Sequence, residues 1–357
     1  METVDYIKLI YQHTLGAEHM VQSGNAKTVL EHELAERELS PSLSSQPFAE
    51  RLPIEAEPVG NDRFRVTLAE MMRLGLSADL AARLFAAGSG LRTCASVEDS
   101  LSEALRILPE TDQLRRYKDH GCPPLHHSDT FRAAYRPAYR VMEGLLLRAL
   151  PFIREVWAHL EDDSEPAGRP LLIAVDGECG SGKSLLSSAL SHILEAPVIH
   201  TDDFYLPMPL RTPEKMREPG WNIDLPRFIE QVAKPLHRGE ATYYAVYDAH
   251  HDELGSSRRL PDARIYIIEG TYSLHPELRK FYDHSVYLTV PSALQKDRIL
   301  SRNGERIYAD FEARWNPDFE RYNSAFEIEK HAEFVLHNDS SSFFLKTAAV
   351  RTQEQLP

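Results

Sequence analysis

Residues 171–194 read LLIAVDGECGSGKSLLSSALSHIL, and this stretch decides the fold. It begins with a short apolar run that ends in Asp-Gly, which is typical of a buried strand in a parallel sheet. It continues with Gly177 to Ser184, a complete G-x-x-x-x-G-K-[ST] pattern, and ends in an apolar helical segment. The order of strand, loop and helix gives the pattern its meaning, because the helix adds its positive end to the backbone N–H groups of the loop.

The loop predicts a site for the phosphates of ATP. Glycines allow the backbone to curl so that several N–H groups point at phosphate oxygens. We expect Lys183 to contact the β- and γ-phosphates and the Ser184 hydroxyl to hold Mg²⁺. A glycine-rich turn that matches by chance would lack the strand and helix on its flanks. The residues expected to bind the nucleotide are Gly177, Glu178, Cys179, Gly180, Ser181, Gly182, Lys183, Ser184 and Leu185.

The second half of the chain alternates between strands and helices. Helical stretches follow Lys183, Leu225 and Ser292. This alternation predicts an α/β fold, a parallel sheet with flanking helices of the type found in P-loop nucleotide-binding proteins. The expected strands are the apolar runs 171–175, 196–203, 263–270 and 284–290.

Three carboxylates stand where two of these strands end. Asp202 and Asp203 close one strand, and Glu269 precedes Gly270 at the end of another. Ligands of open α/β sheets bind at this edge, so Glu269 is a candidate ligand of Mg²⁺, directly or through water. A carboxylate beside the γ-phosphate can accept the proton of a hydroxyl acceptor, which makes Asp202 the candidate base. Helix capping is the alternative role for Glu269 and for one of the two aspartates.

Residues 169–335 resemble the uridine kinase and phosphoribulokinase-like family of P-loop kinases. The matching elements occur in the order of the family: GECGSGKS, HTDDFY, REPGWNIDLPRF, YYAVYD, YIIEGTYSLHPEL, YDHSVYLTV and QKDRILSRNGER. The resemblance implies phosphoryl transfer from ATP to a small-molecule hydroxyl, with Asp202 as base and with Lys183 and Arg302 beside the reacting phosphate. It also implies a set of substrate-binding residues, namely Asp203, Tyr205, Asn222, Asp224, Tyr247, Arg298 and Arg306.

One departure from the family bears on the acceptor. After Tyr247 and Asp248, pyrimidine kinases of this family usually carry another aromatic residue, whereas this chain has Ala249 followed by two histidines. A pyrimidine would lose a stacking surface there. A nucleoside remains the nearest acceptor that the resemblance suggests, and another alcohol, such as a sugar or a vitamin precursor, is the alternative. A switch that binds ATP without transferring phosphate is the alternative from another functional class.

The acidic stretch EDDSEPAGRP, which begins at Glu161, separates the two halves of the chain. The first half has mostly helical periodicity, and we recognise no chemistry in it. Within it, the alternation of residues 63–68 predicts a strand, and residues 141–160 predict a helix that Pro151 bends or breaks. The expected divisions are a mostly helical domain over 1–160, a linker over 161–169, a P-loop kinase domain over 170–345 and a tail over 346–357.

Composition argues against several classes of protein. The 357 residues include 40 Lys and Arg against 54 Asp and Glu, a net charge of −14 that does not favour nucleic-acid binding. No apolar run approaches the roughly 18 residues of a membrane span. The three cysteines show neither a disulfide framework nor zinc-site spacing, so we expect a reducing, cytoplasmic location. The sequence leaves open whether the chain forms a homo-oligomer.

Overall fold

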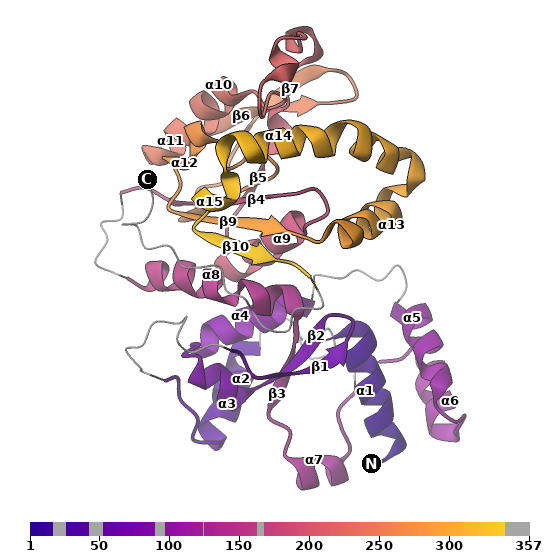
Figure 1. Ribbon diagram of the computed structural model, residues 1–357. Coiled ribbons are helices and arrows are strands. Elements are labelled where there is room, and N and C mark those ends of the chain that lie inside the picture. Colours follow the sequence, from indigo (N-terminus) through magenta and orange to yellow (C-terminus); the bar gives the residue numbers. More distant parts are fainter. Residues whose placement is uncertain (17–25, 43–52, 90–96, 124, 163–167, 340–357) are drawn as a thin grey trace. The chain divides into compact units, whose positions relative to one another are not determined.

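A computed structural model of the protein describes residues 1–16, 26–42, 53–89, 97–123, 125–162 and 168–339 (Figure 1). The chain forms two compact units, Met1–Leu150 and Pro151–Pro357, and the boundary between them falls inside one helix. None of the helices in the described part of the chain has the length and the apolar composition needed to cross a bilayer.

A five-stranded parallel sheet forms the centre of the second unit (Figure 1). Its strands lie in the order β10-β9-β4-β8-β5, and every neighbouring pair is parallel. All five residues of β8 are buried, as expected for a strand covered on both faces. The predicted P-loop type of α/β fold is confirmed. The strands are β4 (Leu171–Gly177), β5 (Val198–His200), β8 (Ile265–Glu269), β9 (His284–Thr289) and β10 (Phe334–His337).

Helices flank this sheet and follow the three positions that the sequence indicated. Helix α9 begins at Lys183, α10 begins at Leu225 and α13 begins at Ser292. A π-helical turn over Ile229–Ala233 separates α10 from α11, and another over Phe311–Trp315 separates α13 from α14. The bounds are α9 (Lys183–Leu194), α10 (Leu225–Phe228), α11 (Lys234–His237), α12 (Pro276–Arg279), α13 (Ser292–Asp310), α14 (Asn316–Phe326) and α15 (Ile328–His331).

Two parts of this unit were not predicted from the sequence. Strands β6 (Tyr243–Asp248) and β7 (Glu253–Arg259) form an antiparallel hairpin apart from the main sheet. Every residue of β7 is exposed, so the strand carries no apolar run or alternation that would mark it. The four-residue strand β10 was also missed.

The first unit combines helices with a small antiparallel sheet of order β1-β2-β3. The expected helices are present, but the small sheet was not expected apart from the strand over residues 63–68. Residues 63–67 form the predicted strand. The helices are α1 (Thr3–Leu15), α2 (Ala26–Glu36), α3 (Leu68–Arg73), α4 (Ala78–Ser89), α5 (Val97–Ala104), α6 (Asp112–Asp119), α7 (Asp129–Tyr135) and α8 (Gly144–Glu161), and the strands are β1 (Ala56–Gly60), β2 (Arg63–Thr67) and β3 (Tyr139–Glu143).

The helix expected over residues 141–160 needs correction at its start. Residues up to Glu143 belong to β3, where Met142 pairs with Phe64 of β2. Residues 141–143 have an apolar spacing that also suits a helix, but they pair with β2 as part of β3. Helix α8 therefore begins only at Gly144. We expected Pro151 to bend or break this helix; it lies inside α8, which continues to Glu161, so there is no break.

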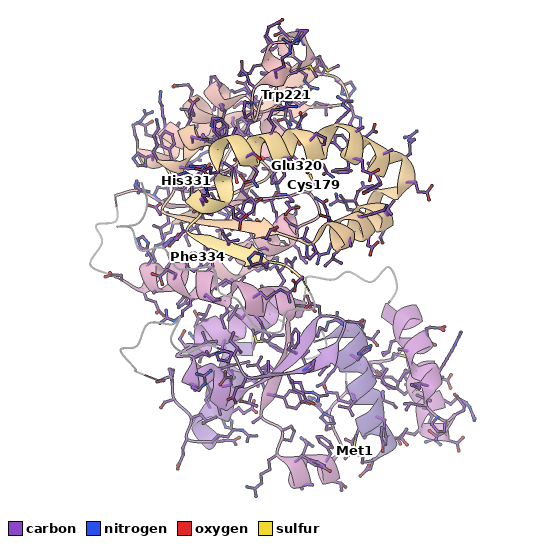
Figure 2. All side chains as sticks on the ribbon, viewed as in Figure 1. Met1, Cys179, Trp221, Glu320, His331 and Phe334 are labelled. Atoms are coloured by element: carbon purple, nitrogen blue, oxygen red, sulfur yellow. The ribbon has the colours of Figure 1, made fainter. Side chains whose placement is uncertain are left out.

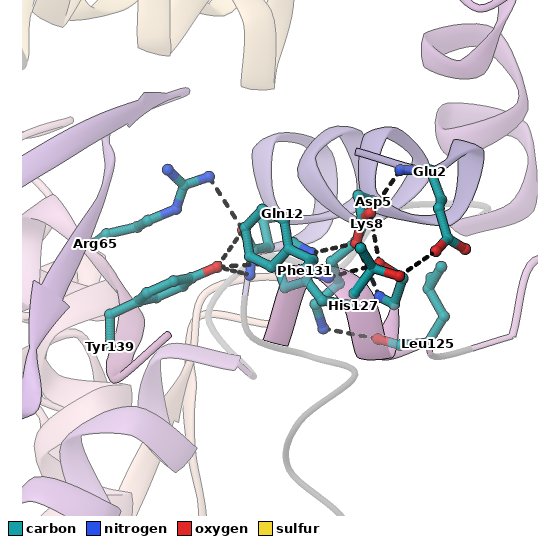
Figure 3. Close-up of polar contacts among 11 residues, drawn as sticks. Glu2, Asp5, Lys8, Gln12, Arg65, Leu125, His127, Phe131 and Tyr139 are labelled. Carbon is teal, nitrogen blue, oxygen red and sulfur yellow. Dashed lines mark hydrogen bonds and ion pairs between the residues drawn. The ribbon is translucent and has the colours of Figure 1, made fainter. Parts of the chain in front are cut away.

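A buried carboxylate ties α1 to the segment before α7 (Figure 3). Asp5 is fully buried and accepts hydrogen bonds of 2.8 Å from Glu2 N, Ser128 N and Ser128 Oγ. His127 Nδ1 lies 3.2 Å from the same carboxylate. Burial opposes ionisation of Asp5, but the hydrogen bonds outweigh it and lower its pKa to about 2. The first unit therefore depends on a charged group satisfied across a long stretch of sequence.

Replacing Asp5 by Asn should destabilise the protein, because the amide nitrogen faces donors where an acceptor is needed. Loss of a buried hydrogen-bond acceptor costs about 1–3 kcal/mol. Urea unfolding at neutral pH, followed by circular dichroism, measures the change against Asp129→Asn, which alters an exposed aspartate of the same unit. Unfolding curves of Asp5→Asn that coincide with those of the wild type would contradict this role.

Candidate active site

The glycine-rich loop joins the end of β4 to the start of α9. Two of its glycines hold conformations and positions that exclude a side chain. At Gly177, which has φ of 141°, a Cβ atom would lie 2.1 Å from the carbonyl oxygen of Leu288 on β9. At Gly182, which has φ of 101°, it would lie 2.6 Å from Asn338 Nδ2. The loop can therefore pass between β9 and the end of β10 only because these residues lack side chains.

Lys183 and Ser184 occupy the first turn of α9. Lys183 is 8% exposed, and its Nζ donates to the carbonyl oxygens of Gly177 and Glu178 at 2.9 and 2.8 Å. Ser184 Oγ donates to Glu269 Oε1 at 3.1 Å. The ammonium group thus stays within the curve of the loop, and the hydroxyl group meets the acid at the end of β8. Cys179, inside the loop, is labelled in Figure 2.

Glu269 contacts two groups with its two carboxylate oxygens. Ser184 occupies one oxygen, and His200 Nδ1 donates to the other at 2.7 Å. Burial disfavours the charge, but hydrogen bonding from His200 and the positive charge of Lys183 lower the pKa of Glu269. The same contact raises the pKa of His200. A charged carboxylate therefore stands directly beside the phosphate loop.

The oxygen atoms of Ser184 and Glu269 are suitable ligands for Mg²⁺. This ion prefers oxygen ligands and is usually held by one or two protein groups, with phosphates and water completing its shell. No cluster of three metal-binding side chains occurs among the described residues. Two protein oxygens at the phosphate loop are the arrangement expected of a metal that arrives with a nucleotide. When bound, it would neutralise phosphate charge.

Asp202 lies in a short 3₁₀ turn, Thr201–Phe204, that directly follows β5. The buried ring of Phe204 anchors this turn, with its centre 4.9 Å from that of Phe228. Asp202 Oδ1 accepts a hydrogen bond of 2.8 Å from Tyr205. Burial raises the pKa of Asp202, and the negative charge of Glu269 adds to the rise. The charges of Lys183 and His200 oppose it. His200, which directly precedes this turn, joins it to Glu269 through the contact of 2.7 Å.

Asp203 points to a different set of partners. Its Oδ2 accepts hydrogen bonds of 2.9 Å from Tyr244 on β6 and from Arg258 on β7. Burial raises the pKa of Asp203, and the charge of Arg258 opposes the rise. Its backbone carbonyl accepts from Arg227 of α10 at 3.0 Å. Asp203 therefore fastens the hairpin to the turn that carries Asp202.

Of the other residues predicted to bind the acceptor, Asp224 and Tyr247 have hydrogen-bond partners within the protein, and Asn222 has a side-chain atom without one among the described residues. Asp224 caps α10 and accepts from the backbone and the guanidinium of Arg227, both at 3.2 Å. Tyr247 donates to Asp252 in the hairpin turn at 2.8 Å. The side-chain oxygen of Asn222 is buried and has no hydrogen-bond partner in the described part of the chain. Of these three, only Asn222 offers a polar atom that awaits a donor.

Asn222 lies beside the segment that follows Asp202, because its backbone carbonyl oxygen accepts a hydrogen bond of 2.8 Å from Leu206 N and its neighbour Ile223 forms a β-bridge with Tyr205. Tyr272, in the segment after β8, has a left-handed φ of 80°, an unusual backbone for a bulky residue. Burial raises the pKa of Tyr205, and the neighbouring Asp202 and Tyr272 raise it further. Tyr205 therefore lies between Asp202, to which its hydroxyl donates, and the segment of Asn222, to which its backbone is bridged. Strained backbone of this kind concentrates at functional sites.

The three predicted lid arginines do not converge. Arg298 Nη1 donates to the carbonyl oxygen of Gly180 in the loop at 3.0 Å. Arg302 bonds to its neighbour Asn303, and Arg306 is exposed. Between Arg302 and Arg306, Gly304 breaks the helical conformation with φ of 77° and ψ of 171°. The break separates the part of α13 that contacts the loop from the part beyond it.

Sequence reasoning missed a buried carboxylate beneath the loop. Asp176 is fully buried and accepts from Gly177 N at 2.6 Å, Leu274 N at 2.8 Å and Tyr322 Oη at 2.8 Å. Burial raises its pKa. The only feature of the sequence that marked Asp176 was the Asp-Gly pair at the end of the first expected strand of the kinase-like half. His200 was also missed, although it begins the HTDDFY element.

No protein-family model matches this chain. Several solved structures match it over about half its length. A protein described as a possible uridine kinase from Bacillus stearothermophilus has 22% identity and a TM-score of 0.39 over 52% of this chain and 98% of its own. A protein described as a fructose transport system kinase from Silicibacter has 26% identity and a TM-score of 0.39 over 50% of this chain and 93% of its own. D-glycerate 3-kinase from Cryptococcus neoformans has 17% identity and a TM-score of 0.38 over 54% and 95%. Uridine kinase-like proteins, which the sequence motifs suggested, are thus among the matches.

Replacing Tyr205 by Phe should raise the pKa of Asp202 further. The phenol donates to the charged carboxylate, and loss of that hydrogen bond favours the protonated form. A carbon-13 NMR titration of the aspartate carboxyls measures the change, and Asp202→Asn identifies the resonance. Tyr243→Phe is the matched control, because Tyr243 is 53% exposed on the hairpin. A pKa of Asp202 that stays the same or falls in Tyr205→Phe would argue against this contact.

Proposed function

We propose that the protein is an ATP-dependent small-molecule kinase that transfers the γ-phosphate to an alcohol hydroxyl. One observation carries the proposal: Asp202 lies in the turn directly after His200, and His200 and Ser184 of the phosphate loop contact the same carboxylate, Glu269, at 2.7 and 3.1 Å. Phosphoryl transfer depends on positioning and on neutralising phosphate charge, with a carboxylate to receive the hydroxyl proton. ATP and Mg²⁺ are the proposed cofactors, and the cytoplasm is the proposed location.

Each group has a role in this proposal. Lys183 leaves the loop carbonyls to contact the phosphates, and Ser184 and Glu269 hold Mg²⁺. Asp202 orients the acceptor hydroxyl and accepts its proton. Burial raises the pKa of Asp202, which makes the carboxylate a better proton acceptor than an exposed aspartate. Arg302 and Arg306, beyond the phosphate loop on α13, are the proposed contacts to the transferred phosphate.

The buried oxygen of Asn222 supports an acceptor pocket. An unsatisfied buried acceptor is costly, and a hydroxyl of the substrate would supply the missing donor. A nucleoside of the uridine kinase type is the acceptor that we propose first, and a sugar or a vitamin precursor is the alternative. Ala249 lies exposed in the turn between β6 and β7 and offers no ring for a base to stack on, which argues against uridine itself as the nucleoside.

Asp202→Asn tests the proposal. The amide keeps the size of the carboxylate but cannot accept a proton, and loss of a general base typically lowers the rate about 10²- to 10⁴-fold. We expect acceptor-dependent ADP release to fall by the lower end of this range, because the proton leaves late in a loose transition state. Affinity for an ATP analogue should be retained, because Lys183 and the loop remain. Asp262→Asn, at an exposed aspartate, is the matched control.

Two outcomes would count against the proposal. Turnover of Asp202→Asn equal to that of the wild type would remove Asp202 from the mechanism. A wild-type protein that binds ATP but shows no stimulation by any member of a panel of nucleosides, sugars and vitamin alcohols would instead favour a nucleotide-dependent switch.

A further inference from the structure

Three successive peptide carbonyls of the phosphate loop are each held by a side chain from outside the loop. The donors come from α13 and from the residue after β10. The contacts are Gln295 Nε2 to Cys179 O at 3.0 Å, Arg298 Nη1 to Gly180 O at 3.0 Å and Asn338 Nδ2 to Ser181 O at 2.7 Å.

The donors are themselves fixed. Gln295 and Arg298 stand three residues apart, so they lie on one face of α13. Asn338 is 4% exposed, its backbone N donates to Thr289 O at the end of β9, and its carbonyl oxygen accepts from Arg298 at 3.3 Å. Gln295 is 9% exposed. Gln295, Arg298 and Asn338 thus form a support that contacts the loop and is itself held by α13 and the ends of β9 and β10.

Peptide geometry makes this support functional. In a trans peptide the C=O and the following N–H point in opposite directions. Because the carbonyls of Cys179 and Ser181 point toward the support, the N–H groups of Gly180 and Gly182 point the other way, toward the space inside the loop where phosphates would bind. The third peptide closes the loop on itself, because Ser181 N donates to Glu178 O at 3.2 Å.

We propose that Gln295, Arg298 and Asn338 are positioning residues that pre-organise the loop for the polyphosphate of the nucleotide. The inference rests on the proposed function and deepens it. Glycines with positive φ would leave the loop free to adopt many conformations, and ordering it on binding would cost affinity. The support supplies that order in advance. It also gives Arg298, expected in a lid, a role beneath the loop instead.

The test measures the affinity for inorganic tripolyphosphate in the presence of Mg²⁺ by calorimetry. Gln295→Met and Asn338→Ala remove one donor each and leave the net charge unchanged. We expect each to weaken binding about five-fold, which is the equilibrium ratio that one typical hydrogen bond is worth. The matched control is Ser301→Ala, an exposed position further along α13.

A second readout separates positioning from a merely structural role. Hydrogen exchange at residues 180–184 of the loop should quicken in both variants, while exchange within α13 and the melting temperature stay at wild-type values. A variant that loses affinity only in proportion to a lower melting temperature would make the residues structural and overturn the proposal. If Asn338→Ala does not fold, Gln295→Met, at the edge of the support, decides the question alone.

The outcomes also separate this inference from the proposed function. Wild-type affinity for tripolyphosphate in both variants would overturn the inference and leave the kinase untouched. A wild-type protein that binds neither tripolyphosphate nor ATP would overturn the proposed function itself, and this inference with it.

Discussion

The buried carboxylate of Asp176 is the contact on which the site depends. It stands at the end of β4, and its hydrogen-bond donors are the first glycine of the phosphate loop, the segment after β8 and Tyr322 of α14. A carboxyl group this far from water costs several kcal/mol unless hydrogen-bond donors satisfy it. Because these donors come from three separate parts of the second unit, the loop, the end of β8 and α14 hold one arrangement relative to one another.

The chemical groups of the site follow from where parallel strands end. Glu269 ends β8, and Asp202 follows β5, its neighbour in the sheet. The charge of Glu269 raises the pKa of Asp202, and Lys183, in the first turn of α9, lowers the pKa of both carboxyls. The division of tasks comes from their surroundings. Hydrogen bonds and the charge of Lys183 lower the pKa of Glu269, which keeps it charged and suited to a metal, whereas burial raises the pKa of Asp202.

Sequence reasoning located the elements that rest on local pattern. The apolar runs gave the strands β4, β5, β8 and β9, and the glycine spacing placed the loop. It could not find β7, whose residues are all exposed, or foresee that Asp203 would turn from its neighbour Asp202 toward Tyr244 and Arg258. It also could not place Arg298 beneath the loop. Such contacts depend on which distant segments meet, and a single residue type at a given spacing does not encode that.

A crystal structure with Mg²⁺ and a non-hydrolysable ATP analogue tests the central claim most directly. At present Lys183 Nζ donates to the carbonyl oxygens of Gly177 and Glu178. The account predicts that this ammonium group moves to the β- and γ-phosphates, with Mg²⁺ between Ser184 and Glu269 and with Asp202 facing the γ-phosphate. An analogue bound away from the loop, or a γ-phosphate directed away from Asp202, would contradict it.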